Sequence, residues 1–184
     1  MNLTDIVFIL LVLAFLALGF FQGTIKLLIA IISFYVSIIL ASLYFQLVGS
    51  FFRQRFRTNL EVGQITAFGV ILMVAFLLLT FAGLYTFRYA RMPPSLDFVD
   101  RIVGTLLGLV MGGLILGMLA EILHLLLIVR SPANEITFPI MRALQSSVRQ
   151  SFLVGFFGNS VLPLVFNIVR PLIPPEAYFL FRVQ

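Results

Sequence analysis

Cysteine is absent from the 184-residue sequence, and histidine occurs once, as His124. A chain without cysteine has no disulfide, no thiolate metal site and no cysteine nucleophile. Carboxylate-bridged di-iron bundles need two Glu-x-x-His motifs and two further glutamates, which one histidine cannot supply. We therefore expect no metal site and no cofactor.

Charged side chains are also scarce. They make up 10% of the residues, whereas 61% are hydrophobic and the mean hydropathy is +1.15. A soluble domain has roughly a quarter of its residues charged, and so few charges could not cover its outside. The surplus apolar surface must face lipid. This predicts an integral membrane protein and excludes a soluble enzyme domain.

The few charges sum to +5, and the twelve basic residues are scattered between apolar runs. Basic residues of membrane proteins usually lie in loops beside anionic headgroups. Nucleic-acid binding would need them clustered on one folded face. The expected partner is the lipid bilayer, and nucleic acid is not expected.

Long apolar runs dominate the first 130 residues. Each is long enough, with its flanks, to cross a bilayer as a helix. No Lys or Arg precedes Lys26, so we interpret the first run as a retained helix and not a cleaved signal peptide. The four runs are Ile6–Phe21, Leu27–Gly49, Ala67–Phe87 and Ile102–Val129. They predict an all-α membrane domain of about four transmembrane helices over residues 1–130.

Proline punctuates residues 131–184, where the apolar stretches are short. The run from Phe152 to Ile173 is apolar, but its glycines, asparagines and Pro163 argue against a straight fifth span. Irregular backbone at membrane depth needs protein or water around it. We expect a C-terminal amphipathic tail that is interfacial or re-entrant.

Small residues recur at intervals of four in or beside the first, second and fourth runs, and the second run contributes Ser33, Ser37 and Ala41. Gly19 and Gly23 form one pair, and Gly104, Gly108 and Gly112 form a longer series. Residues four apart share one helix face, and small side chains on that face let two helices approach closely in lipid. The stripes favour packing within the subunit, with a self-association surface as the alternative.

These residues carry a family resemblance. It lies in three segments: Asp5, then Gly19-Phe-Phe-Gln-Gly23, and then Asp100-Arg101-Ile-Val-Gly104-Thr-Leu-Leu-Gly108-Leu-Val-Met-Gly112. In order and spacing they resemble the CvpA family, the colicin V production proteins, over roughly residues 1–130. Family members usually have arginine where this chain has Gln22 and Met111, so a charged function of those arginines would be lost here. The positions that match are Asp5, Gly19, Gly23, Asp100, Arg101, Gly104, Gly108 and Gly112.

The resemblance implies a small multi-pass protein of the bacterial inner (plasma) membrane, linked to production or export of a colicin V type peptide toxin and to envelope physiology. It implies no enzymatic activity. We expect a non-enzymatic scaffold or accessory component that assembles with other membrane or envelope proteins, or with further copies of itself.

Two groups of polar residues remain as functional candidates. Asp100 and Arg101 stand at the start of the fourth run, where a carboxylate can cap the free N–H groups of its helix. The alternative is a polar cluster of Asp97, Asp100 and Arg101, joined by Asp5, that recognises a partner.

Glu121 and His124 are the second group, spaced i, i+3 on one helix face inside an apolar run. Counted from Ile102, a span of membrane length ends near Glu121, so both groups are expected at the interface, in reach of water. Two other interpretations stay open: a polar contact between helices, and a proton pathway. The last would make the chain an oligomeric transporter or channel subunit.

Overall fold

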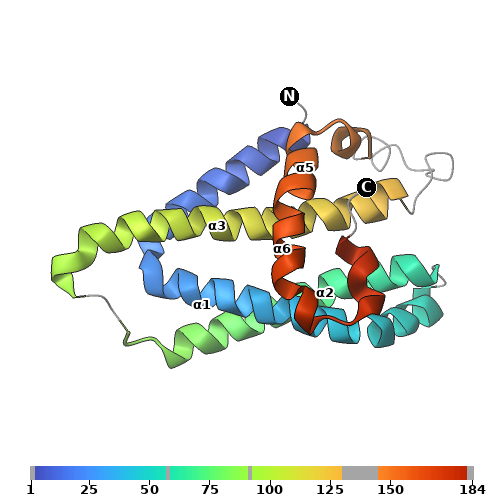
Figure 1. Cartoon of the computed structure of the whole chain (residues 1–184), viewed down its shortest axis with the longest axis horizontal. Helices are drawn as coiled ribbons and strands as arrows, with labels where there is room; N and C mark the ends of the chain where they lie inside the picture. Colours follow the sequence, from blue (N-terminus) through green and yellow to red (C-terminus); the bar gives the residue numbers. More distant parts are fainter. Residues whose placement is uncertain (1–2, 57–58, 91–92, 130–144, 182–184) are drawn as a thin grey trace.

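The computed structural model describes residues 3–56, 59–90, 93–129 and 145–181 (Figure 1). These residues form helices and turns, and none of them lies in a strand. The all-α fold class is therefore confirmed. The boundary between the predicted membrane domain and the tail, at residue 130, lies outside the described residues.

Helix α1 (Leu3–Phe56) contains both of the first two predicted spans, separated by a break at Gly23. Gly23 has φ 75° and ψ 175°, and it is the one glycine with a positive φ in the described part of the chain. A residue with a Cβ rarely adopts this conformation. The chain turns sharply there, so the first half of α1 (residues 3–22) and the second half (residues 24–56) run in different directions (Figure 1).

Helices α2 (Leu60–Thr86) and α3 (Asp97–His124) correspond to the third and fourth predicted spans. The short helix η1 (Pro94–Leu96) precedes α3, and the π-helical turn η2 (Leu125–Val129) continues it. Figure 1 shows α2 beside the second half of α1, and both helices contribute buried side chains to one core. Glycines allow this approach: a Cβ on Gly49 would lie only 2.8 Å from the Cα of Gln64.

The C-terminal segment (residues 145–181) is also helical. A helical turn at 145–149 leads to α5 (Phe152–Phe156), the π-helical η3 (Phe157–Val161) and α6 (Leu162–Val169). The 3-10 helices η4 (Arg170–Leu172) and η5 (Pro175–Phe181) complete it. Pro163 has no N–H to donate, which favours the change of hydrogen-bond spacing in the turn before it. The helix from 152 is thus continuous but irregular.

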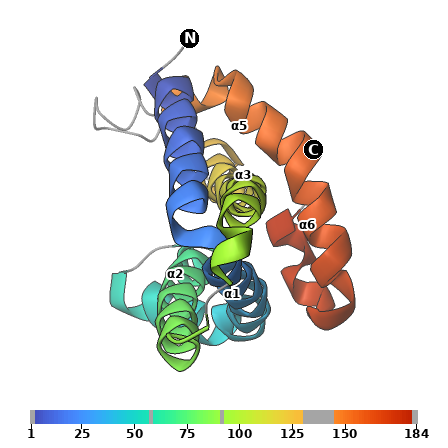
Figure 2. The same cartoon turned by 90° about the vertical axis from the view of Figure 1, so that its left-hand side faces the viewer.

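The C-terminal segment crosses α3 instead of running along it (Figures 1 and 2). Figure 2 shows α3 between the first half of α1 and the helices α5 and α6. A tail that is helical agrees with the sequence-based expectation. Its interfacial or re-entrant placement stays a prediction.

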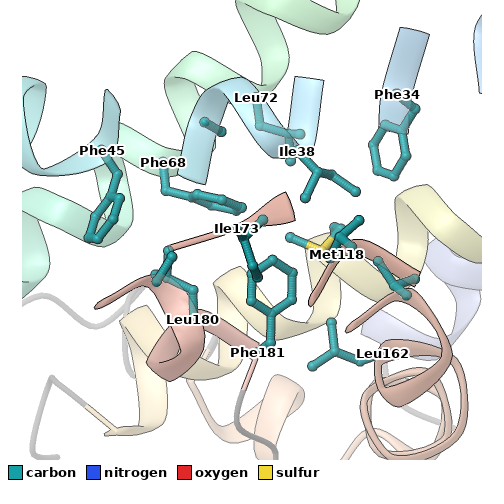
Figure 3. Packing of buried hydrophobic residues seen from close by; sticks show 14 of the residues in the cluster. Phe34, Ile38, Phe45, Phe68, Leu72, Met118, Leu162, Ile173, Leu180 and Phe181 are labelled. Carbon is teal, nitrogen blue, oxygen red and sulfur yellow. The ribbon is translucent and has the colours of Figure 1, made fainter. Parts of the chain in front are cut away.

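Side chains of the C-terminal segment belong to the main apolar core. Leu162 and Leu180 are almost completely buried, and the ring of Phe181 meets the ring of Phe68 edge to face at 6.0 Å between centroids. Figure 3 shows Phe181 among Ile173, Met118 and Leu162. Burial of so much apolar surface fixes the segment against α1, α2 and α3.

Among the residues that the structure describes, four helices are long and apolar enough to cross a membrane: Thr4–Arg55, Leu60–Thr86, Asp97–Leu127 and Phe152–Leu172. The first includes the break at Gly23 and so holds two of the predicted spans. Many large apolar side chains point outward, for example Leu47, Met73 and Phe81, each about two-thirds exposed or more. An exterior of this kind suits lipid. The chain has the architecture of an integral membrane protein.

Candidate functional site

The matching glycines of the two sequence motifs meet where the first half of α1 crosses α3. A Cβ on Gly19 would lie 3.0 Å from the carbonyl carbon of Gly104 and 3.1 Å from the Cα of Gly108. A Cβ on Gly108 would lie 3.0 Å from the Cα of Gly19. The two backbones touch, which only glycine allows on both sides. The glycines of the two motifs therefore lie at a close crossing of helices within one subunit.

Asp100 caps a helix, although not its own. Its Oδ1 accepts a hydrogen bond of 2.8 Å from the backbone N–H of Thr24, the first residue after the break. The Thr24 hydroxyl donates to the backbone carbonyl of Asp100 at 3.2 Å. The N-cap of α3 is instead Leu96, which makes no capping side-chain bond. The expected interaction between a carboxylate and a positive helix end is present, but it joins α3 to the second half of α1.

Other motif residues also pack where the first half of α1 meets α3 beside the break at Gly23, a place that we call the corner. The guanidinium carbon of Arg101 lies 5.4 Å from the centre of the Phe20 ring, a cation–π contact between the two motifs. A Cβ on Gly112 would lie 2.9 Å from the Cβ of Phe15, one helical turn before Gly19. Of the two positions that depart from the family pattern, Met111 is buried and Gln22 is exposed.

Asp5 lies far from this corner. It is 18 residues before Gly23 in a continuous helix, which places the two about 27 Å apart. Its Oδ1 accepts hydrogen bonds from the Ser151 hydroxyl at 2.6 Å and from the backbone N–H of Leu153 at 3.2 Å. The proposed polar cluster therefore does not include Asp5, which instead joins the start of α1 to the start of α5.

Asp5 lies in the first turn of α1, which begins at Leu3. Asp5 is buried, with 6% of its surface exposed. Ser151 is the N-cap of α5 and accepts a hydrogen bond of 3.2 Å from the Val154 N–H. One carboxylate and one hydroxyl thus satisfy two backbone N–H groups at the first turn of α5.

Glu121 is the most deeply buried ionisable side chain in the described part of the chain, with 2% of its surface exposed. Its Oε1 atom has no hydrogen-bond partner among the described residues. It lines a cavity of about 280 Å³ between the end of α3 and the C-terminal segment. The polar side chains that line the cavity with it are His124, Arg149, Ser151 and Asn159.

The expectation that Glu121 and His124 both reach bulk water does not hold for Glu121. His124 is half-buried, whereas the carboxylate is covered by residues after 145. The sequence pattern correctly placed the two groups on one face, since both line the same cavity. It could not show that a segment some 30 residues later in the chain folds over that face.

Sequence reasoning missed Arg149 and Ser151 as members of this site. Ser151 carried a usable signal, because a serine directly before an apolar run is a typical N-cap. Asn159 was noticed only as an interruption of the run. Within the described ranges, no group of three or more His, Cys, Asp or Glu residues could hold a metal ion.

Comparison with known proteins gives one finding. The sequence model of a family described as colicin V production protein matches residues 4–162. The match includes both glycine motifs and extends beyond residue 130 to the first residue of α6. No curated protein and no solved structure matches the chain.

Proposed function

Because the chain belongs to the colicin V production protein family, we propose that it is a non-enzymatic accessory protein of the bacterial inner membrane that supports production or export of a peptide toxin. It does so by assembling with other membrane or envelope proteins. The same role connects it to envelope physiology more broadly.

The observation that carries this proposal is the use of the family motif. Two backbones come into contact at Gly19, Gly23, Gly104 and Gly108. Asp100 joins the same two helices by accepting a hydrogen bond from the Thr24 N–H. The residues that carry the family resemblance therefore build a fixed angle between helices, and none of them lines the cavity beside Glu121. An assembly component needs helices at fixed angles, because its outer surfaces then keep the same arrangement whenever a partner binds.

The outer surface fits such a role. Met73, Leu78 and Phe81 on α2 are each about two-thirds exposed, and Tyr85 follows them at the end of the helix. In lipid, helices associate through packing against surfaces of this kind. The bilayer itself covers whatever part a partner leaves free.

Crosslinking in native membranes, followed by affinity purification and mass spectrometry, tests the proposal. We expect a stoichiometric foreign membrane or envelope protein. Gly108→Leu should abolish its recovery, because the new side chain cannot fit against Gly19. Gly113→Leu is the matched control, since a Cβ at Gly113 meets nothing within 4 Å. Recovery of self-crosslinked oligomers alone would refute the accessory role.

A second candidate function is an oligomeric transporter or channel subunit with a polar path near Glu121 and His124. The observation that favours it is the buried carboxylate without a described partner, at the wall of a polar cavity. Ionisable groups inside membrane proteins often mark ion or proton pathways. Several copies of the chain would have to enclose such a path.

Glu121→Gln separates the two functions. A transport role predicts loss of solute or proton flux in liposomes while assembly stays normal, and an accessory role predicts that partner recovery is unchanged. Glu176→Gln is the control, because Glu176 is an exposed carboxylate in η5 and does not line the Glu121 cavity. Both variants keep the size of the side chain they replace.

A further inference from the structure

The cavity beside Glu121 has the features of a ligand site. Its volume of about 280 Å³ lies near the lower end of the range for small-molecule sites, roughly 300–1,000 Å³. Polar and apolar side chains share its lining, whereas two other cavities of the protein, beside Phe34, are almost entirely apolar. A small polar ligand therefore fits this cavity better than a lipid tail does.

Glu121 places a carboxyl group at one wall of the cavity. A buried carboxylate without a hydrogen-bond partner is unfavourable, because it has lost its hydration and gained nothing in return. When ionised it can only accept hydrogen bonds. The ligand group that best satisfies the Glu121 carboxylate is a cation with several N–H donors, such as a primary ammonium group.

Arg149 provides the opposite charge on the same cavity. It is exposed, and no ion pair joins it to Glu121 in the described part of the chain. A guanidinium group matches phosphate or carboxylate oxygens in a fixed geometry. The Ser151 hydroxyl already donates to Asp5, so it adds no free donor, whereas the Asn159 amide is exposed at the cavity.

We propose that the Glu121 cavity binds a small zwitterion, whose ammonium group pairs with Glu121 and whose phosphate group pairs with Arg149. Ethanolamine phosphate has this chemistry, both as a free molecule and as the headgroup of phosphatidylethanolamine. The site is independent of the accessory role: it binds its ligand whether or not the chain assembles with a partner.

Binding is tested with the full chain in detergent by calorimetric titration with ethanolamine phosphate, and with ethanolamine and inorganic phosphate as half-ligands. The lipid source is tested in phosphatidylglycerol nanodiscs made with or without phosphatidylethanolamine, by native mass spectrometry of the lipids retained after extraction. We expect ethanolamine phosphate to bind more tightly than either half-ligand. Retention of phosphatidylethanolamine without binding of the free compound identifies the lipid as the ligand, and the reverse identifies a soluble zwitterion.

Three substitutions locate the site. Glu121→Gln and Arg149→Gln should each weaken binding by about tenfold or more, the usual effect of losing a hydrogen-bonded charge. Gly155 lines the cavity, and a Cβ there meets nothing within 4 Å, so Gly155→Leu should block binding without disturbing the fold. Gly113→Leu, equally free of contacts and outside the cavity lining, should bind normally.

Two results would overturn the proposal. The first is absence of binding for both the free compound and the lipid, or binding that Glu121→Gln leaves unchanged. The second is equal affinity for ethanolamine and ethanolamine phosphate, which would remove Arg149 from the site and the zwitterion with it. Helix content by circular dichroism and a single peak in size exclusion show that each variant is folded.

Discussion

Replacing Asp100 by alanine should weaken the contact between α3 and the second half of α1 at Gly23 and so lower the stability of the protein. The break in α1 leaves the first N–H groups of its second half without partners in the preceding turn, and Asp100 of α3 accepts the first of them at 2.8 Å. Thr24 is buried, with 7% of its surface exposed, so water cannot fully replace the lost acceptor. The hydroxyl bond from Thr24 to the Asp100 carbonyl does not depend on the side chain and should remain.

The size of the effect follows from the type of bond. A hydrogen bond to a charged group contributes about 1.5–3 kcal/mol, so Asp100→Ala should lower the free energy of unfolding by that order. Asp100→Asn keeps an oxygen acceptor and loses only the charge near the helix end, which contributes about 0.3–1 kcal/mol. The alanine variant should therefore be the less stable of the two.

Unfolding of the purified protein in mixed micelles by increasing mole fractions of dodecyl sulfate, followed by circular dichroism, measures this difference. Asp97→Ala is the control, because Asp97 is exposed in the first turn of the same helix. Equal stability of the Asp100→Ala and Asp97→Ala variants would refute the capping argument. Loss of function in Asp100→Asn at normal protein level would instead support a role for Asp100 in partner recognition.

Three further predictions use the same unfolding assay. Gly108→Leu should cost at least about 1–3 kcal/mol through overpacking at the helix crossing, whereas Gly113→Leu should be close to neutral; equal effects would contradict the close contact. Ser151→Ala should cost about 1–2 kcal/mol, since it removes both a helix cap and the hydroxyl that donates to Asp5, and a neutral result would show that the start of α5 is held by other contacts. Glu121→Met should stabilise the ligand-free protein by about 1 kcal/mol or more, because it removes a buried acceptor without a described partner, and a loss of stability would indicate that the carboxylate is satisfied.

The helices could be predicted from sequence because apolar runs of membrane length leave few alternatives. In lipid a backbone must satisfy its own hydrogen bonds, so a run such as Ala67–Phe87 forms a helix whatever its neighbours do. The start of α2 at Leu60 was missed because residues 60–66 are less apolar than the run after them, although Asn59, a residue type typical of N-caps, directly precedes the helix. Such ends depend on packing, here on the approach of Gly49 to Gln64.

The corner at Gly23 was only half predictable. Spacing marked Gly19 and Gly23 as packing residues, and Gly19 does pack against Gly104. Nothing in the spacing indicated that Gly23 has a positive φ or that Asp100 lies beside it. A glycine tolerates a helix as well as a sharp turn, so its sequence context does not decide between them.

Composition and periodicity along the chain were enough to predict that lipid surrounds this protein, where its apolar helices lie and which residues can approach closely. Three other features are visible in the folded chain alone: Asp100 caps the second half of α1, Asp5 bonds to the start of α5, and the C-terminal segment lies over Glu121. Each of these facts depends on contacts between residues from 76 to 148 positions apart or on a cavity between two elements. Such contacts depend on the directions in which helices cross, and a local residue pattern does not predict those directions.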